Sequence, residues 1–308
     1  MSFFSKSRIG MEISQAGIGA VLVSGSQSTP VLEKVAFRPL QLDSIRISHR
    51  DPHIAKIGHF VAQLKAVWND LKTRETRVAV TLPDISGRIM LLDLEDKWRG
   101  REEALEIIRW KLKKSLPMES ADMHLDFQVL AEREDGETFV MAAIVSKRIL
   151  EQYDEVFHEA GLQAAWVDFT TISLAKAFER NISKESNPIF ITLYDGVLGV
   201  MVFADGVPAF YRSKSLMGAT PGSNRVYMEV NSSVLAYRQR WPERELGPAY
   251  CVAPPDAIDF CAMASEVTGR TAIELETCNI CSFSNVAPAD QETLYPLTAA
   301  IGAALGSL

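Results

Sequence analysis

The sequence predicts an α/β protein of two domains, the first of which carries a small inserted α+β unit. A run of three strand patterns opens the chain, and it recurs after a polar stretch, Asn181 to Pro188, that ends in proline. Between the two runs lies a helix pattern with strand patterns of its own on either side. We therefore expect a first domain over residues 1–187, an insertion over about residues 85–163 and a second domain over residues 188–296.

The insertion is the most legible part of the chain. Its helix, Glu102 to Leu116, carries Leu105, Ile108 and Leu112 at the spacing of one apolar face. Pro117 ends this helix, because the residue before a proline is pushed out of the helical region. The elements expected around it are strands over residues 87–94, 124–131 and 138–146 and a second helix over residues 147–160.

The two domains take their expected elements from the same patterns. In the first domain these are strands over residues 8–14, 20–24, 31–37, 77–82 and 164–169 and helices over residues 53–72 and 171–180. In the second they are strands over residues 189–194, 199–203, 209–212, 249–253 and 271–275 and helices over residues 224–240 and 256–268. The small-residue helix that follows, over residues 297–308, is expected to pack back on the first domain.

Composition and charge exclude several classes of protein. The 308 residues are 47% hydrophobic and 23% charged, which is typical of a globular protein that builds its own core. A formal net charge of −7 argues against a nucleic-acid partner, which requires a basic surface. The sequence contains no signal-peptide pattern and no run of eighteen apolar residues, so we expect a cytoplasmic protein without a membrane span.

Segments at four places resemble the PilM family of type IV pilus assembly proteins, which are actin-like relatives of FtsA. EIIRWKLKKSLPMESADMHLDFQVL is similar to the helix–proline–strand segment of that family's inserted subdomain. AAIVSKRILEQYDEVFHEAGLQAAWVDFTTISLAKAF is similar to the segment that follows it, and RIGMEISQAGIGAVLV and LTAAIGAALG match in position. The resemblance implies a two-domain actin-like (ribonuclease-H-like) fold with a small α+β subdomain inserted in the first domain.

The resemblance also implies a function. A family member is an adaptor at the cytoplasmic face of the inner membrane, where it binds the N-terminal cytoplasmic tail of a PilN-like protein between the first domain and the insertion. It links that protein to the pilus motor, and a motor ATPase, a platform protein and a second copy of the chain are further possible partners. The candidate groove residues, carried over by position, are Leu92, Arg109, Leu112, Lys113, Leu116 and Pro117.

A nucleotide cleft between the domains is implied as well, but its motifs are degenerate here. The family pattern Asp-Ile-Gly is replaced by Glu12-Ile13-Ser14 in the first hairpin and by Thr192-Leu193-Tyr194 in the second, with an acid only at Asp195. Glycine at these turns lets the backbone approach phosphate, and serine or tyrosine does not. We expect weak or absent nucleotide binding and little or no hydrolysis. No cofactor is expected unless the degenerate cleft still binds ATP with Mg²⁺.

Other interpretations remain open at this stage. The chain could be an actin-like ATPase whose nucleotide state switches partner binding, or the cytoplasmic part of a type II secretion platform. The basic run around Trp98 and Arg109 fits a solvated helix face, a lipid-facing surface or a peptide groove. Cys278 and Cys281 have the CxxC spacing of metal and redox sites, but no partner pair fits, so we expect structural thiols and no metal.

Overall fold

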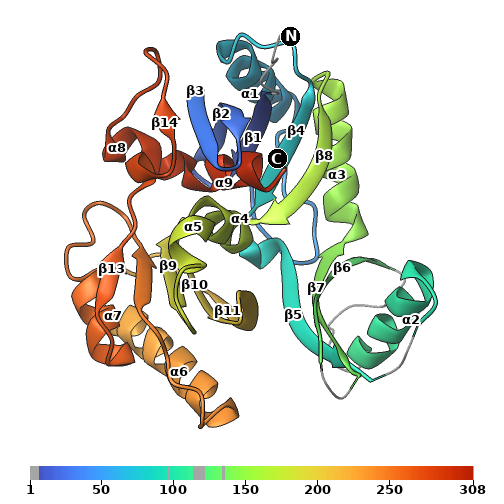
Figure 1. Ribbon diagram of the computed structural model, residues 1–308. Helices are drawn as coiled ribbons and strands as arrows, with labels where there is room; N and C mark the ends of the chain where they lie inside the picture. Colours follow the sequence, from blue (N-terminus) through green and yellow to red (C-terminus); the bar gives the residue numbers. More distant parts are fainter. Residues whose placement is uncertain (1–6, 96–97, 114–121, 134–135, 308) are drawn as a thin grey trace, which may run out of the picture.

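The computed structural model describes residues 7–95, 98–113, 122–133 and 136–307, and it folds them around three β-sheets (Figure 1). The strands of the first sheet are β1 (Arg8–Ile13), β2 (Gly17–Ser26), β3 (Thr29–Pro39), β4 (Arg77–Leu82), β8 (Gln163–Phe169) and β14 (Ser282–Phe283). Their order is β14-β3-β2-β1-β4-β8, so β8 is the last strand on one side. β1, β2 and β3 are antiparallel neighbours, while β4 pairs parallel with both β1 and β8.

Helices cover the first sheet. α1 (Ile57–Asp70) packs beside α3 (Lys147–Glu159), whereas α4 (Thr170–Ala177) packs beside α9 (Thr298–Gly306), which crosses β1, β2 and β4. Residues Ile9 to Ile13 of β1 are all buried, as expected for a strand with both faces covered. The C-terminal helix α9 therefore contacts the first sheet.

The second sheet repeats the arrangement of the first. Its strands are β9 (Ile189–Tyr194), β10 (Val197–Ala204), β11 (Val207–Ser215), β12 (Ala249–Val252) and β13 (Ala272–Glu274), in the order β11-β10-β9-β12-β13. β9–β10–β11 is an antiparallel meander joined by two Asp-Gly turns, and all four turn residues have positive φ, which suits a two-residue hairpin. The helices α6 (Asn224–Arg240) and α7 (Phe260–Thr268) pack together and against this sheet.

The insertion forms the third sheet, β5-β7-β6, from β5 (Gly87–Leu94), β6 (Met123–Glu132) and β7 (Thr138–Ser146). α2 (Arg101–Leu112) packs on it through Ala104, Ile108 and Leu112, which belong to a core separate from that of the two larger sheets. Figure 1 shows this unit projecting from the lower end of β8 and α3. The short elements of the chain are η1 (Asp84–Ser86), α5 (Glu179–Ile182), η3 (Thr277–Asn279), α8 (Gln291–Leu294) and η4 (Tyr295–Leu297).

Several sequence expectations differ from these elements. The helix expected over residues 171–180 is divided into α4 and α5, and the helix expected from residue 256 begins only at Phe260. The chain also returns to the first sheet before residue 296, because β14 pairs with β3. We propose that the boundary between the domains lies at residues 187 and 188, as the sequence suggests, and that the second domain ends before β14 rather than at residue 296. Among the residues that the structure describes, helix length and hydropathy nowhere reach what a membrane span requires.

Candidate functional site

Side chains close the cleft between the first and second sheets. Glu12 of β1 and Tyr194 of β9 are both buried, and the Tyr194 hydroxyl donates a hydrogen bond to Glu12 Oε2 at 2.9 Å. The same hydroxyl lies 3.2 Å from the carbonyl oxygen of Tyr295, just before α9. Tyr194 therefore joins the two sheets at the position where the family pattern has a glycine.

Glu12 also caps α9. The backbone N–H groups of Ala299 and Ala300 donate to its carboxyl group, and the first N–H groups of a helix have no partner within the helix. Burial raises the pKa of Glu12 well above its usual range, although the hydrogen bonds from Tyr194 and α9 act in the opposite direction. One carboxyl group thus holds β1, β9 and α9 together.

The two hairpin turns also contact each other. The carboxylate of Asp195 accepts the backbone N–H of Gln15, and burial raises the pKa of Asp195 to about 6. The Ser14 hydroxyl forms hydrogen bonds of 3.2 Å with the backbone of Gly17 inside its own turn, and Thr192 of β9 is buried. Backbone N–H groups at such turns are what a phosphate group needs. Because a carboxylate and a phenol take that place, the residues present do not fit the phosphates of a nucleotide.

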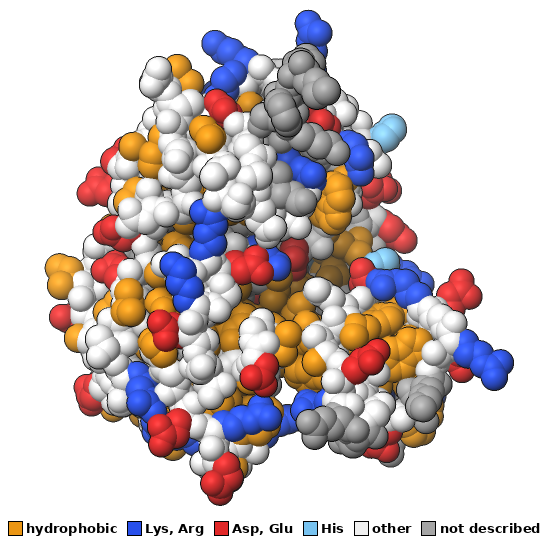
Figure 2. Space-filling view, in the orientation of Figure 1, with side chains coloured by type: hydrophobic (Ala, Val, Ile, Leu, Met, Phe, Trp, Pro, Cys, Tyr) orange, Lys and Arg blue, Asp and Glu red, His pale blue; other side chains and the backbone are white. Residues whose placement is uncertain are grey.

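A groove of about 510 Å³ opens between β8, α4, α9, the tip of the β10–β11 hairpin and the insertion. Figure 2 shows hydrophobic side chains gathered around a hollow between the second-sheet body and the inserted unit. The larger apolar residues that line the groove include Leu130, Met141, Trp166, Val167, Ile172, Met201, Phe203 and Pro208. Trp166 and Val167 lie on β8 and are 48% and 43% exposed, respectively.

The charged residues of the groove wall are mostly acidic. Asp168, Glu179 and Glu185 line it together with one base, Lys176, which lies 3.4 Å from Glu179. Asp168 is open to the groove and accepts the N–H of Phe169 at 2.8 Å. Protein atoms around the groove replace part of the water near this exposed carboxyl group, and this desolvation raises the pKa of Asp168 to about 6, with a further contribution from nearby Asp84.

Asp84 anchors the root of the insertion. It lies in η1, between β4 and β5, and is buried. Its carboxylate accepts the N–H and hydroxyl groups of Thr171 on α4, the latter at 3.0 Å, and the hydroxyl of Tyr211 on β11 at 2.8 Å. Burial raises the pKa of Asp84, which these hydrogen bonds partly offset. The insertion, α4 and the second sheet are therefore joined at one residue.

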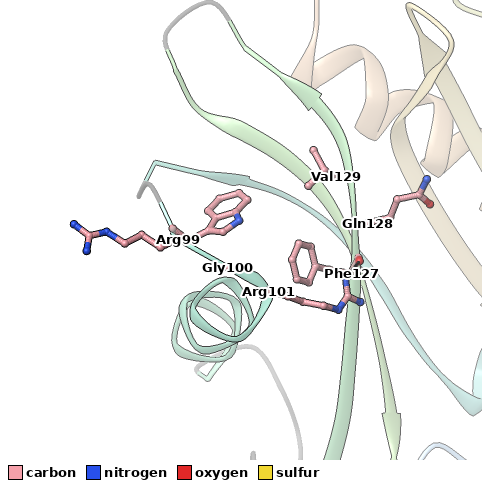
Figure 3. A pocket seen from close by; sticks show the side chains of 7 residues that line it. Arg99, Gly100, Arg101, Phe127, Gln128 and Val129 are labelled. Carbon is pink, nitrogen blue, oxygen red and sulfur yellow. Dashed lines mark hydrogen bonds between the residues drawn. The ribbon is translucent and has the colours of Figure 1, made fainter.

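A second hollow, of about 540 Å³, lies on the insertion next to the groove, and Gln128 lines both. Trp98 stands edge-on to Phe127, with ring centroids 6.5 Å apart, and the guanidinium group of Arg101 lies 4.8 Å from the Phe127 ring centroid. In Figure 3, Phe127 and Arg101 lie close together, whereas Arg99 points away from them. Much of this surface is therefore already used in contacts within the insertion.

The predicted groove residues lie elsewhere. Leu112 is 1% exposed, packs in the core of the insertion and does not line the groove. Leu92 of β5 is partly buried against the same core, and Arg109 pairs with Glu106 of its own helix at 2.5 Å. Lys113 follows α2 and is exposed, while the predictions for Leu116 and Pro117 fall outside the described residues. Sequence reasoning missed Trp166, Val167 and Asp168, which carry no local motif and meet the insertion only through the fold.

Among the described residues, no group of three or more histidine, cysteine or acidic side chains is placed so that it could hold a metal ion. Cys278 and Cys281 are free and partly buried. Burial raises the pKa of the Cys281 thiol to about 12, which disfavours the thiolate that metal binding and redox chemistry require.

Comparisons with known proteins agree with the predicted fold. A family profile described as type IV pilus assembly protein PilM matches residues 10–216. The comparison with curated proteins gives no match. Among solved structures, a chain of a PilM–PilN type IV pilus biogenesis complex is 16% identical, with a TM-score of 0.82 and coverage of 97% of this chain and 98% of that one.

Two further solved structures share the fold at lower similarity. One is a Bacteroides thetaiotaomicron protein with an actin-like ATPase fold, 12% identical, with a TM-score of 0.55 and coverage of 89% of this chain and 94% of that one. The other is the cytoplasmic domain of EpsL, an inner-membrane component of the type II secretion system of Vibrio cholerae. It is 11% identical, with a TM-score of 0.53 and coverage of 98% and 96%.

These likenesses confirm the actin-like α/β fold. The family profile spans more than half of the chain, including the opening hairpin, the whole insertion and the first strands of the second sheet. The chain therefore belongs to the family of type IV pilus assembly proteins PilM.

Proposed function

We propose that this protein is an adaptor of type IV pilus assembly that holds the N-terminal cytoplasmic tail of a PilN-like inner-membrane protein. The observation that carries the proposal is the apolar groove beside β8, at the junction of the first sheet and the insertion. Membership of the PilM family and the likeness to a chain of a PilM–PilN complex support it. The tail would keep the protein at the cytoplasmic face of the inner membrane.

The groove suits an extended peptide. β8 ends its sheet, and none of the described strands pairs with its outer side, so its backbone can accept another strand. Trp166 and Val167 offer apolar surface at this edge, and exposed apolar surface beside polar residues is typical of a binding site. We therefore move the proposed site from α2 to β8, which keeps it between the first domain and the insertion.

The adaptor is proposed to work without a nucleotide switch. Its support is chemical. Tyr194 and Glu12 fill the cleft, and the carboxylate of Asp195 already accepts the hydrogen bond of a hairpin N–H that a phosphate group would need. The alternative of a nucleotide-switched ATPase requires these contacts to open first. A motor ATPase, a platform protein and a second copy of this chain stay as further proposed partners.

The proposal is tested with a fluorescent synthetic peptide of the N-terminal tail of the cognate PilN-like protein, by anisotropy titration. Trp166→Ala removes a large part of the groove wall and is expected to weaken binding at least about 10-fold, because aromatic anchors dominate such interfaces. Trp110→Ala is the matched control, since Trp110 is 78% exposed on α2 and lies outside the groove.

Arg109→Glu tests the surface that the sequence suggested. Full binding by Trp166→Ala together with loss of binding by Arg109→Glu would return the site to α2. No binding of the peptide by the wild-type protein would remove the adaptor proposal itself.

A further inference from the structure

The charges of the groove wall are not balanced. Of its four described charged residues, Lys176 and Glu179 pair with each other. Asp168 and Glu185 form no ion pair with any residue that the structure describes. A groove lined largely by apolar side chains therefore presents uncompensated negative charge to the group that enters it.

The groove also holds a polar group without a partner. Ser173 of α4 is 1% exposed and lines the groove, and its hydroxyl group has no hydrogen-bond partner among the described residues. Buried polar side chains nearly always have a partner, so an unsatisfied one in a groove wall points to a ligand that supplies it. A group rich in hydrogen-bond donors would satisfy both this hydroxyl oxygen and a carboxylate.

We propose that the groove recognises a cationic group of the docked tail at Asp168, with the Ser173 hydroxyl as a second acceptor. The inference rests on the proposed function and names the chemistry of its partner. The cation is an arginine or lysine side chain or the free terminal ammonium group, all of which donate several hydrogen bonds. Cytoplasmic segments next to a membrane span are enriched in arginine and lysine, so such a tail matches the charge of the groove.

The surroundings of Asp168 favour this assignment. The charged groups that act on it are Asp84, which repels its negative charge, and Lys176, which is already paired with Glu179. The pKa of about 6 keeps Asp168 ionised at neutral pH, yet leaves the carboxylate poorly compensated in the free protein. A cation from the tail supplies the missing positive charge in a place that is partly shielded from solvent.

The test compares three forms of the tail peptide: unmodified, with each arginine and lysine replaced by neutral citrulline or norleucine, and with an acetylated N-terminus. Asp168→Asn is expected to weaken binding of the unmodified peptide about 10-fold or more, the usual size for losing a charged hydrogen bond in a shielded site. Asp168→Asn should cause no further loss of affinity for the peptide that lacks the recognised cation. Which modified peptide shows this insensitivity tells whether the cation is a side chain or the terminal ammonium group.

Controls keep the result interpretable. Glu155→Gln, an exposed change on α3 outside the groove, should bind like the wild type. If Asp168→Asn fails to fold, Glu185→Gln at the exposed groove rim should show the same dependence on the peptide's charge, with a smaller loss. Equal affinity of the wild type, Asp168→Asn and Glu185→Gln for the unmodified peptide overturns the cation site but not the groove as the place where the tail binds. Failure of the wild type to bind any peptide instead overturns the proposed function, and the cation site with it.

Discussion

At the scale of single residues, the sequence singled out the right positions but not their contacts. Glu12, Tyr194 and Asp195 stood out because they replace the small or acidic residues of a nucleotide cleft. Their partners lie far away in the chain, since the Tyr194 hydroxyl and the Glu12 carboxyl are 182 positions apart. That one side chain satisfies the other, and that both meet α9, depends on how two sheets pack, which no local pattern encodes.

Asp195 gives a pH-dependent prediction. Its pKa rises from 3.8 to about 6 on folding, so the folded protein holds this proton more tightly than the unfolded chain. Its contribution to stability is therefore complete below the lower value and is lost as the pH rises through about 6. Asparagine tolerates the left-handed φ of 46° at this position and carries no charge. The stability of Asp195→Asn relative to wild type should increase with pH across this window.

Urea unfolding at several pH values between about 4 and 7 measures this difference. Asp205→Asn, in the corresponding β10–β11 turn at a φ of 53°, controls for the change of turn residue itself. A stability difference between Asp195→Asn and wild type that stays constant, or decreases, as the pH rises would contradict the burial of this carboxyl group.

At the scale of elements, periodicity located most helices and strands but not what each one packs against. The apolar face of α2 was correctly recognised, yet Leu112 was assigned to a partner surface although it belongs to the core of the insertion. The reverse holds for α9, whose small residues gave little amphipathic signal. They are explained by close packing, because a Cβ atom at Gly10 of β1 would lie 1.8 Å from the carbonyl oxygen of Ala300.

The packing of α9 predicts a sharp difference between two glycines. A Cβ atom at Gly302 would lie 1.8 Å from the carbonyl oxygen of Ser173, whereas one at Gly306 would meet nothing closer than 3.6 Å. Gly302→Ala is expected to destabilise the protein by about 1–3 kcal/mol, because the backbone of α4 must move. Gly306→Ala should be neutral or stabilising by up to about 1 kcal/mol, as expected for alanine in a helix. Similar urea midpoints for the two variants would show that α9 and α4 are not in such close contact.

At the scale of the whole molecule, the repeated strand pattern predicted the two-part architecture, and the structure has it. The groove could not be predicted in this way, because its lining comes from segments between Ala79 and Ser307. In the sequence, the apolar residues of β8 form an ordinary strand pattern. They become part of a groove only because the fold brings the insertion and the β10–β11 hairpin beside them. The sequence did show that the nucleotide motifs are degenerate. This argues against a nucleotide site between the two domains.

The closed cleft leads to a prediction about ligands. Ligands that bind the folded state alone raise its thermal midpoint. Millimolar MgATP is expected to shift the midpoint of the wild-type protein by less than about 1 °C, whereas saturating tail peptide should raise it by several degrees. Differential scanning fluorimetry measures both. A rise of several degrees with MgATP would mean that Tyr194 and Asp195 yield to phosphate, and the nucleotide-switched alternative would take precedence.

The anchoring of Asp84 has a mechanical consequence. In the proposed function, a tail bound along β8 belongs to a protein that is fixed in a membrane, so a pull between the membrane and the adaptor acts on the groove. Because Asp84 bonds to both α4 and β11 at the root of the insertion, the insertion cannot swing away from the second sheet without breaking these bonds. We therefore expect a pull on a bound tail to be resisted by these hydrogen bonds, which join the root of the insertion to α4 and to the second sheet.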